Sequence, residues 1–128
     1  MKKYMKENKF TIIFEKYIRA KKMHGVFELK QTDIDSIPFS KVEEHQLESL
    51  IAAQHNGFLH KISDADPRRK AFDIVYTRPL MGYIAIRFPK VTCVITVNNF
   101  VFERDRSKRK SLTIERAREI STCILASK

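Results

Sequence analysis

The sequence has few cysteines, few glycines and no long hydrophobic run, and each scarcity argues against a class of protein. Cys93 and Cys123 lack the paired spacing of a zinc site, so we expect reduced thiols in a cytoplasmic protein. No apolar segment approaches the roughly 18 residues that cross a bilayer, and no apolar stretch follows the basic start MKKYMKENKF. We therefore expect neither a membrane partner nor a signal peptide. The lack of a glycine-rich phosphate loop argues against a nucleotide hydrolase.

The hydrophobic content is sufficient for one compact domain. Of the 128 residues, 43% are hydrophobic and nine are Phe, which is enough apolar material for a single core. We therefore expect one domain over residues 1–128, with the basic segment 103–128 as part of it.

Positive charge is abundant but unevenly distributed. The formal net charge is +10, of which residues 1–30 contribute +6, residues 31–66 contribute −5 and residues 67–128 contribute +9. A basic chain with an acidic middle suggests a polyanionic partner and a local site that holds carboxylates together. Solubility alone is the simpler explanation of the charge. The run RDRSKRK at 104–110 concentrates the charge in one place and favours nucleic acid.

Contacts with nucleic acid are expected at basic side chains in three places along the chain. Such contacts hold backbone phosphates and carry no sequence information. The residues predicted to make them are Lys41, Arg68, Arg69, Lys70, Arg104, Arg106, Lys108, Arg109 and Lys110.

The hydrophobic pattern predicts the element order α-β-α-β-β-β-β-α. Helices are expected over residues 7–20, 40–54 and 111–125, the second with a capping box of Ser40 and Glu43, and the third capped by Ser111 or Thr113. Strands are expected over residues 25–31, 58–63, 71–77, 82–88 and 92–102. This order indicates an α/β fold in three layers, with a central mixed β-sheet flanked by α-helices.

The strand GVFELKQT contains two charges that its apolar neighbours do not explain. Glu28 and Lys30 are two residues apart, so both point to the same face of the strand, where desolvating them is costly. Gln46 lies four residues after Val42 and four before Leu50, which puts its amide on the sheet-facing side of the following helix. We expect its partner to be Glu28 or Lys30.

A second charge of this kind is Asp73, in the strand KAFDIVY. Two acids and a lysine on core strands of one small sheet are difficult to explain as packing. An edge strand with an ordinary surface ion pair is the alternative interpretation of Glu28 and Lys30.

FELK, followed by IPFSKVEEHQLESL, resembles the PD-(D/E)XK nucleases, and among them the Holliday junction resolvases of bacteria and phages. The resemblance covers about residues 25–50 and implies a restriction-endonuclease-like fold. It also implies that Glu28 is a metal ligand, that Lys30 polarises the attacking water or the phosphate, and that Gln46 supports the site. In the family a metal-binding Asp precedes the Glu-x-Lys strand, whereas RAKKMHG has no acid, which makes Asp73 the substitute.

The resemblance implies a Mg²⁺ (or Mn²⁺) ion held by Glu28, Asp73 and the carbonyl of Leu29. The family also uses a supporting carboxylate on the first helix. Glu7 falls about 60° from Phe10 on a helical wheel, beside the apolar stripe, whereas Glu15 falls about 140° away. The implied function is a metal-dependent, structure-selective DNA endonuclease. Because two strands must be cut, we expect a homodimer that binds branched DNA.

Two other functions fit the same sequence. The first is a protein with a nuclease fold that has lost catalysis and only binds nucleic acid. The second is a small basic viral protein that binds or inhibits another protein. A large distance between Asp73 and Glu28 would favour the first of these, and in the second Glu28 and Lys30 form a structural pair.

Overall fold

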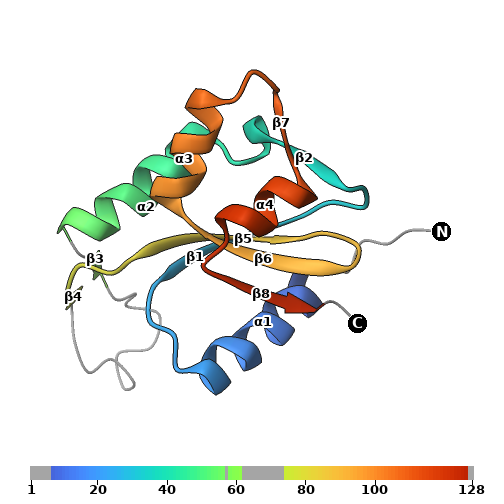
Figure 1. The fold of residues 1–128 in the computed structure, drawn as a ribbon. Helices are drawn as coiled ribbons and strands as arrows, with labels where there is room; N and C mark the ends of the chain where they lie inside the picture. Colours follow the sequence, from blue (N-terminus) through green and yellow to red (C-terminus); the bar gives the residue numbers. More distant parts are fainter. Residues whose placement is uncertain (1–6, 57, 62–73, 127–128) are drawn as a thin grey trace.

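The computed structural model describes residues 7–56, 58–61 and 74–126, which form a mixed α/β fold with a central mixed sheet flanked by helices (Figure 1). The helices are α1 (Glu7–Lys21), η1 (Phe39–Lys41, a 3₁₀ turn), α2 (Glu44–Asn56), α3 (Val97–Arg106) and α4 (Ile114–Ile120). The strands are β1 (Val26–Gln31), β2 (Ser36–Pro38), β3 (Phe58–Lys61), β4 (Ile74–Thr77), β5 (Gly82–Arg87), β6 (Val91–Thr96), β7 (Ser111–Thr113) and β8 (Cys123–Ala126). None of the described helices is both long and apolar enough to cross a membrane.

The central sheet has the strand order β1-β5-β6-β8. β1 runs parallel to β5, with Glu28 opposite Ile84 and Lys30 opposite Ile86, while β5–β6 and β6–β8 are antiparallel pairs. Two small antiparallel pairs, β2–β7 and β3–β4, lie outside this sheet. β1 is therefore an edge strand in the described part of the fold.

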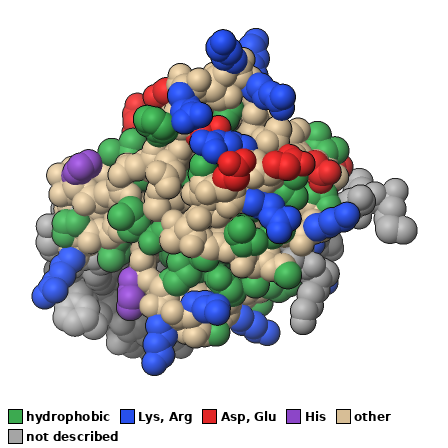
Figure 2. Space-filling model, in the orientation of Figure 1, with side chains coloured by type: hydrophobic (Ala, Val, Ile, Leu, Met, Phe, Trp, Pro, Cys, Tyr) green, Lys and Arg blue, Asp and Glu red, His purple; other side chains and the backbone are tan. Residues whose placement is uncertain are grey.

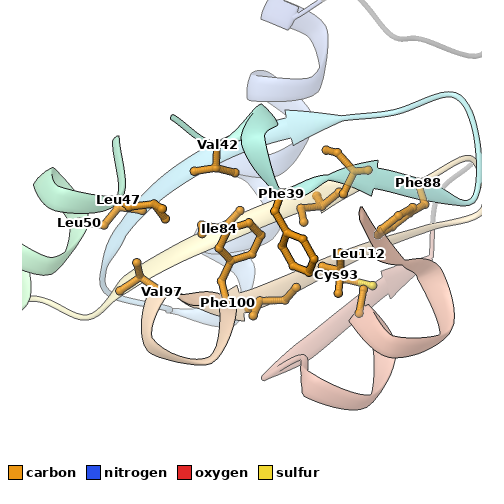
Figure 3. Close-up of a cluster of buried hydrophobic side chains, with 14 of the residues drawn as sticks. Phe39, Val42, Leu47, Leu50, Ile84, Phe88, Cys93, Val97, Phe100 and Leu112 are labelled. Carbon is orange, nitrogen blue, oxygen red and sulfur yellow. The ribbon is translucent and has the colours of Figure 1, made fainter. Parts of the chain in front are cut away.

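The sheet is covered on both faces by apolar side chains. On one face Ile84 and Ile86 of β5 join a cluster with residues of α2, α3 and α4 (Figure 3). On the other face Ala85 packs with Phe10 and Phe14 of α1. Ile84, Ala85 and Ile86 are all fully buried, as expected for a strand in the middle of three layers.

The backbone of α2 passes very close to the start of β5. A Cβ atom at Gly82, the first residue of β5, would lie 2.9 Å from the carbonyl oxygen of Leu50 in α2. Only glycine leaves room for the two backbones at this distance. The start of α2 is thereby positioned above the polar residues of β1.

The predicted strand over residues 92–102 is wrong in its second half. β6 ends at Thr96, whose hydroxyl accepts a hydrogen bond from the Asn99 N–H at 3.2 Å and caps α3. Val97, Phe100 and Glu103 are the buried residues of that helix. Their spacing of three is helical, but the apolar content of TCVITVNNFVF also suits a strand.

Two predicted helices have different bounds in the structure. Residues 111–125 form three elements, β7, α4 and β8, and Thr113 caps α4 by accepting from the Arg116 N–H at 3.3 Å. The helix predicted over 40–54 starts at Glu44, because residues 39–41 form the 3₁₀ turn. β7 pairs with β2, and β8 pairs with β6. The short sequences of β7 and β8 do not indicate these partners.

We predict that Phe100→Ala destabilises the protein and that Phe102→Ala does not. Phe100 is fully buried and contacts Phe39 edge to face at 5.7 Å between ring centroids, whereas Phe102 is 65% exposed. Removing the buried ring should lower the free energy of unfolding by about 3–5 kcal/mol. Removing the exposed ring should change it by about 0.5 kcal/mol or less. Urea denaturation of both variants measures the difference, and equal losses would contradict the helical register of α3.

Candidate functional site

The structure places Glu28 and Lys30 on the same face of β1, as their spacing predicts. Glu28 Oε1 lies 3.5 Å from Lys30 Nζ, and the two side chains are 27% and 19% exposed. Their face is the one that α2 covers, because Val26 on the same face packs against the α2–α3–α4 cluster. Phe27 and Leu29 point the other way, toward α1. Both side chains are therefore partly buried under α2 and partly exposed to solvent.

Gln46 from α2 completes a three-residue cluster, which we call the Glu28 cluster (Glu28, Lys30 and Gln46). Its Nε2 donates to Glu28 Oε1 at 2.5 Å, and Glu28 is one of the two partners expected from the sequence. Its Oε1 accepts from the backbone N–H of Glu43 at 2.9 Å. Glu43 directly precedes α2 and Gln46 is the third residue of the helix, so this second bond is the reaching-back half of a capping box. Both ends of the amide are engaged, which determines the orientation of the group.

The backbone of Leu29 faces the open edge of β1. The N–H groups of Val26 and Thr32 donate to the carbonyls of Met81 and Arg87, at the two ends of β5, at 2.9 and 3.0 Å. Successive residues of a strand direct their backbone groups to opposite sides. Leu29 therefore directs its carbonyl away from β5, toward an edge that no described strand pairs with. This oxygen belongs to the residue between Glu28 and Lys30 in the sequence.

Several predicted site residues lie outside the described residues. They are Asp73, Arg68, Arg69, Lys70 and the side chain of Glu7. The helix that begins at Glu7 packs against Phe27 and Leu29, on the face opposite Glu28. Within residues 7–56, 58–61 and 74–126, no three His, Cys, Asp or Glu side chains come together as a metal site.

Basic side chains gather over the end of α3 and the loop that follows it, at the top of the view in Figure 2. Arg106, Lys108, Arg109 and Lys110 are exposed there, and Lys41 is exposed in η1. The Phe39 N–H donates to the Lys110 carbonyl at 3.0 Å, which ties the loop to the start of η1. These residues therefore form one charged surface.

Arg104 differs from the rest of the basic run. Its guanidinium donates to Asp105 and to Glu44 of α2, each at 3.0 Å, and its side chain is 29% exposed. The hydrogen bond to Asp105, followed by the charges of Asp105 and Glu44, raises the pKa of Arg104 above its ordinary value despite some desolvation. Arg104 thus joins α3 to the start of α2, near the Glu28 cluster.

A pocket of about 520 Å³ beneath the basic loop was not predicted from the sequence. We call it the basic pocket, and its charged lining residues are Glu103, Arg106, Lys108, Arg109 and Arg116. Glu103 is 7% exposed. The run ERDRSKRK suggests a solvated surface, and only the spacing of Val97, Phe100 and Glu103 indicates that this acid faces inward.

Comparison of the chain with protein-family models, with curated proteins and with solved structures found no match. The functional argument therefore depends on the residues and their geometry.

We predict that Gln46 and Glu28 are energetically coupled. Gln46→Leu removes a hydrogen bond to a half-buried carboxylate, so a double-mutant cycle with Glu28→Leu should give a coupling of about 1 kcal/mol in the free energy of unfolding. The control pair is Glu43 and His45, which approach to 3.2 Å with side chains 64% and 72% exposed. Cycles with Ala at these two positions should give a coupling near zero. Equal coupling in both cycles would contradict a special role for the Gln46 contact.

Proposed function

We propose that this protein is a metal-dependent, structure-selective DNA endonuclease of the PD-(D/E)XK type, similar to Holliday junction resolvases. The observation that carries the proposal is the double contact of Glu28 Oε1, with the Gln46 amide at 2.5 Å and with Lys30 Nζ at 3.5 Å. A carboxylate, an ammonium and an amide that meet at a half-buried sheet edge are costly as packing elements. The mixed sheet between layers of helices supports a restriction-endonuclease-like fold as part of this proposal.

The oxygen atoms at this edge suit Mg²⁺ or Mn²⁺. Magnesium is commonly held by one or two carboxylates together with water and substrate phosphates. Glu28 and the carbonyl of Leu29 offer such oxygens, and Asp73, which lies outside the described residues, is the proposed second carboxylate. A bound ion lowers the pKa of a coordinated water and stabilises negative charge on the phosphate.

Lys30 and Gln46 have separate roles beside Glu28. The ammonium of Lys30 stabilises negative charge on the scissile phosphate or orients the attacking water. Gln46 is a positioning residue, because its amide holds the Glu28 carboxylate and is itself held by the Glu43 N–H. Preorganised groups of this kind do not have to reorient when the charge develops.

The charged surface at the α3–β7 loop supplies affinity for DNA. Its exposed cations hold backbone phosphates without reading sequence, which suits an enzyme that selects a branched structure. Symmetric cutting of two strands requires two active sites, so the proposed functional form is a two-fold dimer in the cytoplasm.

A nucleic-acid-binding protein without catalysis is the second candidate. It is favoured by the contacts of Glu28 Oε1 with Gln46 and Lys30, which pair this oxygen without a metal ion. In that case the Glu28 cluster is a structural network at the edge of the sheet. Cleavage assays with and without a divalent ion separate the two functions.

We predict that Glu28→Gln abolishes Mg²⁺-dependent cleavage of branched DNA, with a loss of at least about a hundredfold. The substitution keeps the shape of the side chain and removes its charge, so the fold and DNA binding should persist. Gln46→Leu should lower the rate by about 10- to 100-fold, as expected for a residue that orients a ligand. Cleavage of four-way and linear DNA in Mg²⁺, Mn²⁺ and EDTA measures these effects.

The same assay includes Lys30→Ala, which should be inactive, and Lys16→Ala, an exposed lysine of α1 that should behave like the wild type. Asp73→Asn should match Glu28→Gln, and the two losses should not add if both residues serve one ion. Full activity of Glu28→Gln, or cleavage in EDTA, would refute the proposed mechanism.

We predict that the loop cations determine the salt dependence of DNA binding. Replacing Lys108, Arg109 and Lys110 by Ala should reduce the slope of log K against log salt by up to about three, because each phosphate contact contributes about 0.9. The control replaces the exposed α1 residues Lys9, Lys16 and Arg19, which removes the same charge from a different part of the surface. Fluorescence anisotropy at several salt concentrations gives the slopes. An unchanged slope in the loop variant would show that the loop does not contact DNA.

A further inference from the structure

The basic pocket has a carboxylate at its floor and cations at its rim. Glu103 is buried, with its side chain 9% exposed, and Oε2 accepts from Arg116 Nε at 2.9 Å. At the rim, Lys108 and Arg109 are exposed and form no ion pair with a described residue. The pocket, of about 520 Å³, is within the size range of small-molecule sites.

One oxygen of the floor carboxylate lacks a hydrogen bond. Among the described residues, Glu103 Oε1 is a buried side-chain oxygen with no hydrogen-bond partner. Arg106 Nε is the nearby cation, at 3.7 Å, which is beyond hydrogen-bonding distance. Buried oxygens of this kind are rarely left unsatisfied, so Oε1 has an unused acceptor site, which a donor group in the pocket reaches when the carboxylate turns toward it.

The charge pattern specifies a ligand with two different ends. A simple anion is attracted by Lys108 and Arg109, and Arg116 and Arg106 balance the charge of Glu103. The anion nevertheless leaves Glu103 Oε1 without a hydrogen-bond donor. A simple amine can donate a hydrogen bond to Glu103 Oε1 but is repelled by the lysine and arginine side chains that line the pocket. A molecule with an N–H donor at one end and a phosphate at the other satisfies both parts of the pocket.

We propose that the basic pocket binds a nucleotide whose base is unpaired, with an exocyclic amino group donating to Glu103 Oε1 and the phosphate held by Lys108 and Arg109. Cytosine, adenine and guanine carry such an amino group, and a carboxylate accepting from the cytosine amino group is a known form of base recognition. Thymine has a single N–H between two carbonyl oxygens, which the carboxylate repels. Watson–Crick pairing leaves one N–H of this amino group in the major groove, but a base stacked inside a duplex cannot enter a pocket of about 520 Å³, so the site takes an unpaired base.

An unpaired nucleotide of a DNA strand and a free nucleotide present the same groups. The choice of DNA as the source rests on the proposed function, because branched DNA has unpaired or splayed bases at its branch point and ends. Arg104 links the two regions, since it belongs to the helix that carries Glu103 and contacts Glu44 of α2. Gln46, two residues beyond Glu44, contacts Glu28.

The test uses the full chain in EDTA, so that binding is measured apart from the metal site. Titration calorimetry with dCMP and dTMP should show at least about a tenfold preference for dCMP. Glu103→Gln should abolish that preference. The Gln carbonyl replaces Oε2 opposite Arg116, so its NH₂ faces the pocket and accommodates a thymine oxygen.

A second pair of variants tests the rim without changing a buried residue. Lys108→Ala with Arg109→Ala should weaken dCMP binding about tenfold and leave deoxycytidine, which has no phosphate, unaffected. Lys9→Ala with Lys16→Ala removes the same charge from α1 and should change neither affinity. These variants keep the proposal testable if Glu103→Gln fails to fold.

Duplexes that end in an unpaired dC, in an unpaired dT or in a blunt end distinguish the two sources. Tighter binding of the dC end than of the dT and blunt ends supports a DNA site, and a preference seen only with free dCMP supports a nucleotide site. Equal binding of dCMP, dTMP and inorganic phosphate, or a dCMP preference that survives Glu103→Gln, overturns the proposal. This binding result is independent of catalysis, because the nuclease proposal is refuted by cleavage that does not depend on Glu28 or that persists in EDTA.

Discussion

The burial of both faces of β5 is the constraint on which the rest of the structure depends. Ile84 and Ile86 must be covered on one face and Ala85 on the other, so helices are required on both sides of the sheet. Among the described elements, α2, α3 and α4 cover the side with the two isoleucines, and α1 covers the alanine side. β1 lies at the edge of this arrangement, where each of its residues is only partly buried. Polar groups are therefore tolerated on β1, whereas the middle of β5 is apolar and its one charged residue, the buried Arg87, lies at the end of the strand.

The Glu28 cluster depends on the same layering. α2 approaches β5 closely at Gly82, and its first turn consequently lies over β1. Gln46 performs two tasks there, because one end of its amide caps the helix and the other end holds Glu28. Helix formation and site geometry are thus coupled through one side chain. This double contact satisfies the hydrogen-bonding groups of an amide that lies on an otherwise apolar helix face.

α3 combines a packing face with a charged end. Val97 and Phe100 belong to the main core, and Glu103, one turn further, continues the same face into the basic pocket. The Arg116 guanidinium compensates one oxygen of this carboxylate, and the Glu103 hydrogen bond raises the pKa of Arg116 above its ordinary value. The charged loop that follows α3 is fixed on both sides. Before it, Arg104 of α3 donates to the Glu44 carboxylate, and at its end the Lys110 carbonyl accepts from the Phe39 N–H. The positively charged side chains of this loop are therefore carried by a backbone that is tied to α2 and η1.

The sequence by itself determined the features that depend on local periodicity. It predicted the first helix, the strand over residues 25–31, the shared face of Glu28 and Lys30, and the inward direction of Gln46. Each of these follows from the repeat of 3.6 or 2 residues along one element. The central mixed sheet between helices also follows from the order of the elements.

Tertiary structure alone decided the features that depend on a distant partner. Residues 111–113 and 123–126 are short segments whose state depends on pairing, so β7 and β8 became strands beside β2 and β6. Residues 97–102 instead became the first part of α3, which Thr96 caps. The burial of Glu103 could not be read from a run of charges, because it requires Arg116, thirteen residues away, as its partner. The open edge at Leu29 likewise depends on which strands pair with β1. Hydrogen-bond partners far apart in sequence are set by packing, and local propensity carries no information about them.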